Sequence, residues 1–141
     1  MPRALFPSDR LFVIAGPCVI EGDALNLKVA DHLLRLSERV PGGIIFKASF
    51  DKANRSNAGA HRGPGIAGGL AALSRVRDET GLPILTDVHE PAQCGVVAEV
   101  VDVLQIPAFL CRQTDLLVAA GRTDRKSTRL NSSHEWISRM P

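Results

Sequence analysis

The 141-residue sequence is poor in aromatic side chains, with no tyrosine, one tryptophan and five phenylalanines. It also lacks an excess of either charge. The last eighteen residues hold four Lys or Arg and two Asp or Glu, which leaves thirteen residues of each sign in residues 1–123. Nucleic-acid binding requires a basic face or aromatic side chains on which bases stack. The composition therefore argues against nucleic acid as a partner.

Long apolar runs are missing too. No stretch approaches the about 18 apolar residues that a membrane span requires, and the N-terminus has no apolar segment of secretory length. Three cysteines, Cys18, Cys94 and Cys111, are odd in number, widely spaced and in no C-x-x-C pair, which indicates reduced thiols. We therefore expect one soluble cytoplasmic domain with no membrane contact.

Four short apolar runs are typical of buried parallel strands, because they lack the alternation of a half-exposed sheet. They cover residues 11–15, 44–48, 83–88 and 101–106. The segments between them carry apolar stripes with helical spacing, as in Leu27, Ala30 and Leu34. Pro91 suits a first helical position, and Gly121 suits the residue after a helix that begins near Thr114 or Asp115. The pattern predicts four successive βα units.

Polar residues follow each of the four predicted strands directly. They are Cys18, the segment 47–55, Asp87 with His89, and the segment 105–112. In a (β/α)8 barrel the carboxyl ends of all strands form one mouth, where active sites lie. A doubly wound sheet places ligands mainly at one switch point. Four polar strand ends out of four favour the barrel.

The segment 46–56, FKASFDKANRS, is the clearest functional signal. Lys47, Lys52 and Arg55 provide many hydrogen-bond donors, with Asp51 as the one acid, so the local field favours small anions such as phosphate. A solvated basic loop is the alternative. Lys47 ends an apolar run, where a merely decorative lysine is least expected, and its position favours the binding role.

A second glycine-rich segment, residues 63–68, matches the G-x-G-x-x-G dinucleotide fingerprint. The fingerprint must follow its strand immediately, but here residues 49–62 intervene. We therefore interpret these glycines as the turn into a helix, whose free N–H groups would still favour an anion.

Four blocks resemble the signatures of 3-deoxy-D-manno-octulosonate 8-phosphate synthases: KASFDKANRS at 47–56, RGPG at 62–65, TDVHEP at 86–91 and QIPAFLCRQTD at 105–115. The resemblance runs from about Leu11 to about Thr123. It implies a (β/α)8 barrel that condenses phosphoenolpyruvate with D-arabinose 5-phosphate and water, in lipopolysaccharide precursor synthesis. It also implies a homotetramer. The related 3-deoxy-D-arabino-heptulosonate 7-phosphate synthase, which uses erythrose 4-phosphate, is the enzymatic alternative, and a non-enzymatic anion-binding half-barrel is the other.

The resemblance also implies roles for individual residues. Lys52, Gln105 and the backbone around Ala108 belong to the phosphoenolpyruvate site, and Lys47 lies where the two substrates meet. Arg112 reaches the pentose phosphate bound to a neighbouring subunit, although taken alone it would suit a surface salt bridge. The pentose phosphate site includes Asn54, Arg55 and Ser56, which favour the octulosonate enzyme over its relative.

Cys18 is a candidate metal ligand by the same resemblance, because the metal-dependent branch of the family has cysteine at this position and the metal-independent branch has asparagine. A thiolate suits a divalent ion of the Zn, Fe or Mn class. Taken alone, such a cysteine is more often a small buried residue. The family's other ligands come from later strands that this chain lacks, and His89 matches none of them.

Asp87 and His89 lie two residues apart at a predicted strand end. They suit either a carboxylate–histidine acid/base pair or a supporting hydrogen-bonded network at the barrel mouth, and we favour the supporting role.

The family pattern stops after Thr123. Residues 124–141 contain no strand-like run and four apolar residues without a sustained period, which is the composition of a disordered tail and resembles a translated adapter sequence. We therefore divide the chain into residues 1–123, the N-terminal half of a barrel synthase, and the foreign tail 124–141. Since four strands cannot close a barrel, we expect the chain alone to be inactive.

Overall fold

The computed structural model describes residues 9–52, 59, 62–123 and 125–129. The chain forms two compact units, Met1–Leu85 and Thr86–Pro141, whose boundary falls inside one strand. Both units consist of parallel strands alternating with helices, which places the protein in the α/β class.

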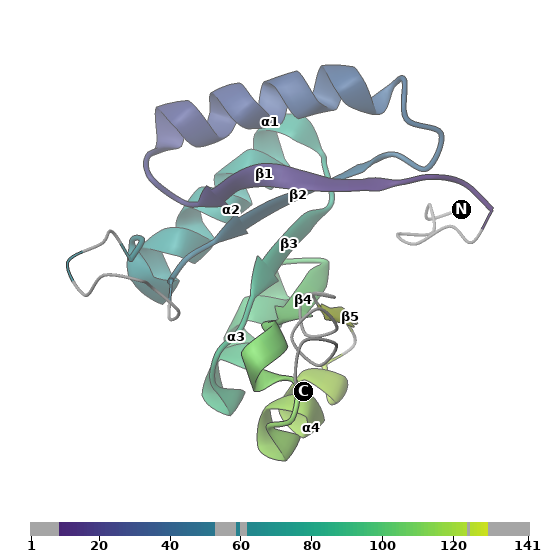
Figure 1. Ribbon diagram of the computed structural model, residues 1–141. Helices are drawn as coiled ribbons and strands as arrows, with labels where there is room; N and C mark the ends of the chain where they lie inside the picture. The colour runs from purple at the N-terminus through teal and green to yellow at the C-terminus, as the bar shows by residue number, and fades with distance from the viewer. Residues whose placement is uncertain (1–8, 53–58, 60–61, 124, 130–141) are drawn as a thin grey trace, which may run out of the picture. The chain divides into compact units, whose positions relative to one another are not determined.

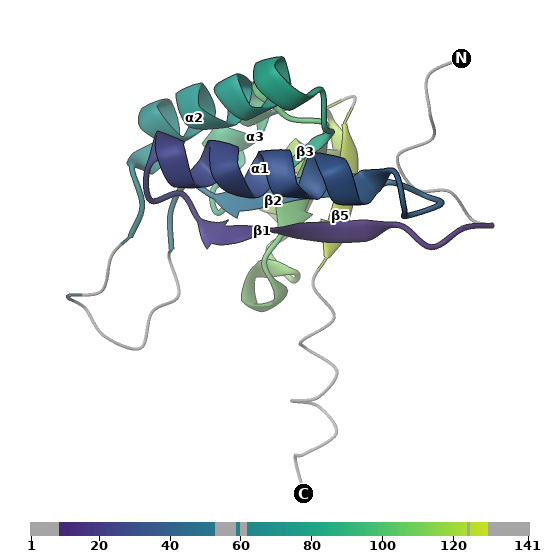
Figure 2. The same cartoon turned by 90° about the horizontal axis from the view of Figure 1, so that it is seen from above.

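The first unit is built from β1 (Val13–Val19), α1 (Asp23–Ser37), β2 (Ile44–Ser49), α2 (Gly65–Thr80) and the start of β3 (Ile84–Asp87). Its strands are parallel in the order β1-β2-β3, with Val13 opposite Ile44 and Phe46 opposite Ile84. Helix α1 packs against β1, β2 and α2 (Figures 1 and 2). These strands therefore end side by side, at the edge that carries the polar segments.

The core of this unit lies between the two helices and the sheet. Phe46, Leu73 and Ile84 are fully buried in it. Asn26 on α1 is also buried, with 2% of its surface exposed, and neither amide atom has a hydrogen-bond partner among the described residues. An unpaired buried amide costs about 1–3 kcal/mol of stability. The predicted apolar stripe of α1 did not indicate that Asn26 is buried.

The glycine-rich segment at 63–68 turns the chain into α2, as the sequence predicts. Gly63 and Gly65 have φ values of 106° and 76°, which favour glycine, and α2 begins at Gly65. A Cβ on Gly69 would lie 2.2 Å from the Cβ of Phe50, so this glycine lets α2 approach the end of β2 closely. The glycines are therefore used for chain reversal and packing.

The second unit contains the end of β3, α3 (Pro91–Val100), β4 (Val103–Ile106), the 3-10 turn η1 (Ala108–Leu110), α4 (Thr114–Gly121) and β5 (Lys126–Arg129). The Val88 N–H donates to the Gln105 carbonyl at 3.1 Å, just beyond the end of β3. Strand β5 is parallel to β4, with Val103 opposite Lys126. Pro91 occupies the first helical position of α3, as predicted.

The four predicted strands and the helices between them are confirmed. Three details are wrong. The first strand covers Val13–Val19 rather than residues 11–15, so Cys18 lies inside the strand and not after it. Gly121 is the last residue of α4 rather than the residue after it. Residues 126–129 form a fifth strand, although the sequence after Thr123 predicts none; residues 130–141 lie outside the described part. Among the described residues, no helix combines the length and apolarity that a membrane crossing requires.

Candidate functional site

The end of β1 is bent so that it presents Cys18. Between Ala15 and Cys18, β1 has one residue more than the facing part of β2, which is the signature of a β-bulge. Gly16 makes the bulge possible, because a Cβ there would lie 1.8 Å from the Lys47 carbonyl oxygen. Cys18 itself has a φ of 61°, which is rare for a residue with a side chain, and it is exposed. Such backbone strain is concentrated at functional sites.

Two lysine ammonium groups converge on one hydroxyl at the end of β2. The Ser49 Oγ lies 3.3 Å from the Lys47 Nζ and 3.2 Å from the Lys52 Nζ. The Lys47 Nζ also lies 3.5 Å from the Cys18 carbonyl oxygen, so it is held between two strand ends. Two cations that share a neutral acceptor form a local positive field. The arrangement is suited to an anion with several oxygens.

Asp51, the residue before Lys52, forms a bidentate ion pair with Arg62. The Arg62 Nε donates to Oδ1 of Asp51 at 2.8 Å, and Nη2 donates to Oδ2 at 2.6 Å. The hydrogen bonds and the negative charge of Asp51 raise the pKa of Arg62. The Lys52 N–H also donates to the Arg62 carbonyl at 2.8 Å. Backbone and side chain of Arg62 therefore both contact the Asp51–Lys52 pair.

The residues predicted for the pentose phosphate, Asn54, Arg55 and Ser56, lie outside the described residues. Their assignment stays a prediction.

In the second unit, Asp87 and His89 are brought together. The His89 Nε2 lies 3.0 Å from the Asp87 Oδ2, and the side chains are 11% and 8% exposed. The Gln93 Oε1 accepts the His89 N–H at 2.8 Å, which fixes the backbone between β3 and α3. Their contact suits both the acid/base pair and the supporting network. The choice between these roles stays open.

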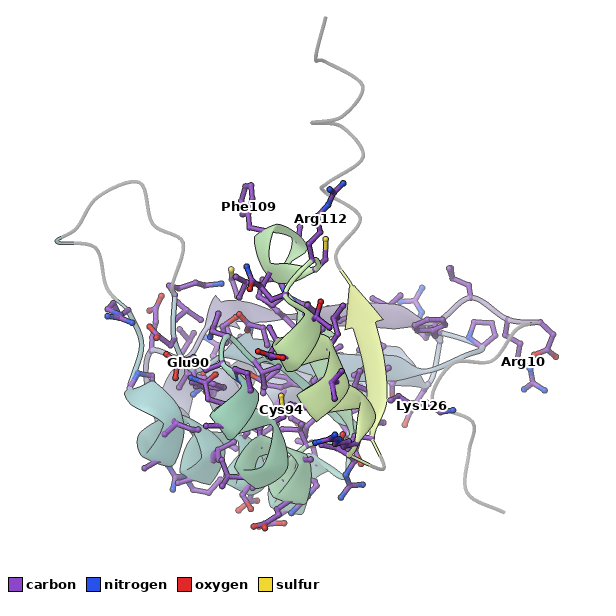
Figure 3. The ribbon with its side chains drawn as sticks, turned by 90° about the horizontal axis from the view of Figure 1, so that it is seen from below. Arg10, Glu90, Cys94, Phe109, Arg112 and Lys126 are labelled. Carbon is purple, nitrogen blue, oxygen red and sulfur yellow. The ribbon has the colours of Figure 1, made fainter. Side chains whose placement is uncertain are left out.

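Gln105 and the turn after β4 supply the remaining predicted residues of this unit. Gln105 is buried, and Ala108 is half-buried at the start of η1. Phe109 and Arg112 project from this turn (Figure 3), and 75% of Phe109 is exposed. The exposed Arg112 is thus placed where it can contact a partner or ligand.

Cys18 is the one residue for which the sequence predicts metal binding. Within the part of the chain that the structure describes, no three His, Cys, Asp or Glu side chains gather into a group that could hold a metal ion. Metal sites in proteins need at least three protein ligands in most cases. These residues therefore do not form a complete metal site, and we assign no reaction step to a metal.

The environments of the cysteines predict different reactivities. Cys94 (Figure 3) is buried, and burial raises the pKa of its thiol. Cys18, in contrast, is exposed. Because the thiolate is the reactive form, in the folded, metal-free chain at pH 8 we expect Cys18 to react with iodoacetamide at least about tenfold faster than Cys94. Peptide mass spectrometry after timed labelling measures this ratio, and unfolding in urea should remove it. Equal rates before unfolding would contradict the described burial.

Comparison with known families identifies the chain. The model of the DAHP synthetase I family matches residues 7–126, which include β1 to β4 and the lysine pair. The chain belongs to this family. Membership assigns its βα units to the (β/α)8 barrel class, as the polar strand ends predict.

Three similar curated proteins are each named 2-dehydro-3-deoxyphosphooctonate aldolase. The protein of Syntrophotalea carbinolica is 56% identical over 132 residues, covering 89% of this chain and 48% of the relative. That of Synechococcus sp. is 56% identical over 115 residues, which cover 82% of this chain and 40% of the relative. That of Caulobacter vibrioides is 54% identical over 124 residues, which cover 88% of this chain and 43% of the relative. The chain therefore spans less than half the length of these relatives.

Two features of this family member were missed in the sequence. The role of Ser49 could have been found, because Lys47 and Ser49 are two residues apart on a strand and must point to the same face. The Asp51–Arg62 pair had no comparable signal, since its partners are eleven residues apart in the sequence.

Proposed function

We propose that this chain is part of an enzyme that condenses phosphoenolpyruvate with D-arabinose 5-phosphate and water, giving 3-deoxy-D-manno-octulosonate 8-phosphate and inorganic phosphate. The observation that supports it most is the convergence of Lys47 and Lys52 on Ser49 at a strand end. The names of the relatives point to the eight-carbon product rather than to the seven-carbon product of the related enzyme.

The reaction brings together a phosphate, a carboxylate and an aldehyde, so charge and orientation dominate catalysis. Lys52 binds the phosphoenolpyruvate anion, with Gln105 and the backbone around Ala108 as further contacts. Lys47, held between the ends of β1 and β2, lies where the substrates meet and stabilises negative charge that develops on the aldehyde oxygen. Ser49 positions both ammonium groups. Asn54, Arg55 and Ser56 bind the pentose phosphate.

We also propose that Cys18 supplies one ligand to a divalent metal of the Zn, Fe or Mn class. Its exposure and its strained backbone at a β-bulge support this role, because strained residues cluster at functional sites. A bound metal would act as a Lewis acid or orient the aldehyde. The other ligands would come from residues beyond those described.

The complete enzyme is proposed to be a cytoplasmic homotetramer in which Arg112 reaches the pentose phosphate of a neighbouring subunit. The exposure of Arg112 on the turn after β4 is consistent with such a contact.

A product assay tests the proposed reaction. Residues 1–123 are joined to the remaining C-terminal part of the Syntrophotalea carbinolica relative, and we call this chimera the completed protein. With phosphoenolpyruvate, we expect kcat/KM for arabinose 5-phosphate to exceed that for erythrose 4-phosphate by at least about 100-fold, because the pentose phosphate site is built for the longer sugar. Mass spectrometry of the product and phosphate release measure both rates.

The intact relative serves as the control for this assay. A clear preference of the completed protein for erythrose 4-phosphate would show that the octulosonate assignment is wrong. An inactive completed protein beside an active relative would show that residues 1–123 do not supply their half of the site.

A further inference from the structure

The segment from Phe46 to Arg62 has one acidic residue, Asp51, among several basic residues. This carboxylate directly precedes Lys52. The two side chains leave consecutive Cα atoms that are about 3.8 Å apart, and physiological salt only partly screens charges at the separations that these side chains can reach. A negative charge at this position would weaken the attraction of Lys52 for an anionic ligand. The ion pair between Arg62 and Asp51 opposes this effect.

We propose that Arg62 neutralises Asp51 and thereby preserves the positive field of Lys47 and Lys52 for an anionic substrate. Arg62 is then a positioning and charge-balancing residue that acts through Asp51. The inference rests on the proposed function, since it names a residue that tunes the same anion site. The ligand that it concerns is a phosphorylated carboxylate such as phosphoenolpyruvate.

The geometry of the pair supports this role. Arg62 donates to both oxygens of Asp51, at 2.8 and 2.6 Å, in the fork arrangement that directs the carboxylate toward the guanidinium. The Lys52 N–H donates to the Arg62 carbonyl, so the same residue also fixes the backbone of the lysine. Arginine suits the task because it stays charged at every relevant pH.

An ordinary surface ion pair in the same unit provides a matched control. The Arg75 Nη2 lies 2.7 Å from the Asp23 Oδ2, and the exposed fractions of the two side chains are 50% and 52%. The corresponding values for Arg62 and Asp51 are 55% and 21%. The pairs have the same chemistry, but only the Asp51–Arg62 pair adjoins Lys52 in the sequence. Removal of the Arg75 pair should not affect anion binding.

A double-mutant cycle separates charge balance from a purely structural role. In the completed protein, Arg62→Gln should raise the Kd and the KM for phosphoenolpyruvate by roughly three- to tenfold with little change in kcat, because Asp51 loses its counter-charge. Asp51→Asn should bind phosphoenolpyruvate as tightly as the unmodified protein or more tightly. The double variant should recover most of the lost affinity, and Arg75→Gln should change nothing. Isothermal titration and steady-state kinetics measure these values.

Other outcomes would overturn the inference. If the pair only braces the loop, Arg62→Gln and Asp51→Asn will weaken binding equally, and the double variant will show no recovery. Arg62→Gln without effect on the Kd would exclude charge balance directly. Because binding is measured separately from turnover, a completed protein that binds phosphoenolpyruvate without making the eight-carbon product would contradict the proposed function while leaving the cycle decisive. Failure of the unmodified protein to bind phosphoenolpyruvate would overturn both.

Discussion

Replacing either lysine at the end of β2 should lower the activity of the completed protein by about 10²–10³-fold in kcat/KM for phosphoenolpyruvate, the effect typical of a group that stabilises charge in a transition state. The substitutions are Lys47→Met and Lys52→Met, which keep the length of the side chain and remove its charge. Neither lysine belongs to the buried core, and both are half-buried, so neither change is expected to disturb the core. Steady-state kinetics under saturating arabinose 5-phosphate measure the loss.

The two lysines should differ in whether the loss of kcat/KM comes from a higher KM or from a lower kcat. Lys52→Met should act mainly through the KM for phosphoenolpyruvate, because Lys52 is proposed to bind the ground-state anion. Lys47→Met should act mainly through kcat, because Lys47 is proposed to stabilise charge that appears during the reaction. Lys28→Met, at an exposed position of α1, is the control for loss of one positive charge. A loss of less than about threefold for both site lysines would remove the basis of the proposed anion site.

The parts of the fold that the sequence predicts are those set by local pattern. The apolar run that becomes β2 and the proline that begins α3 are both determined by neighbouring residues, through burial of a parallel strand and through the fixed φ of proline. The placement of Lys47 at the end of such a run predicts an anion site, and the structure adds that Lys52 approaches the same Ser49 hydroxyl. Polar residues after successive strands were likewise sufficient to indicate the barrel class.

The features that could not be predicted depend on contacts between distant segments. The bulge in β1 exists because Gly16 approaches the backbone of Lys47, thirty-one residues later in the chain. The Asp51–Arg62 pair joins two side chains that are eleven residues apart in the sequence. Strand β5 has no apolar pattern, and its pairing with β4 depends on backbone hydrogen bonds that any sequence can make. In each case the missing information is tertiary.

The bulge also explains why Cys18, rather than one of the other cysteines, is the residue to test for metal binding. A left-handed conformation costs a non-glycine residue about 1–2 kcal/mol, and an extended conformation without the bulge would avoid this cost. The strain directs a thiol outward at the carboxyl end of a strand, beside the lysine at which the substrates are proposed to meet. Cys94, by contrast, is buried.

We therefore expect the completed protein to lose its activity on treatment with a chelator and to regain it when a divalent metal is added. Cys18→Ser should lower metal affinity by at least roughly 100-fold, because loss of a direct ligand should exceed the 10- to 100-fold effect of losing an outer contact. Metal content after dialysis, measured by mass spectrometry, gives a readout that does not depend on turnover. Cys111→Ser, at a half-buried position in the turn after β4, is the control and should retain the metal. Full turnover after verified removal of all metal would leave Cys18 as an exposed thiol whose strained backbone needs another explanation.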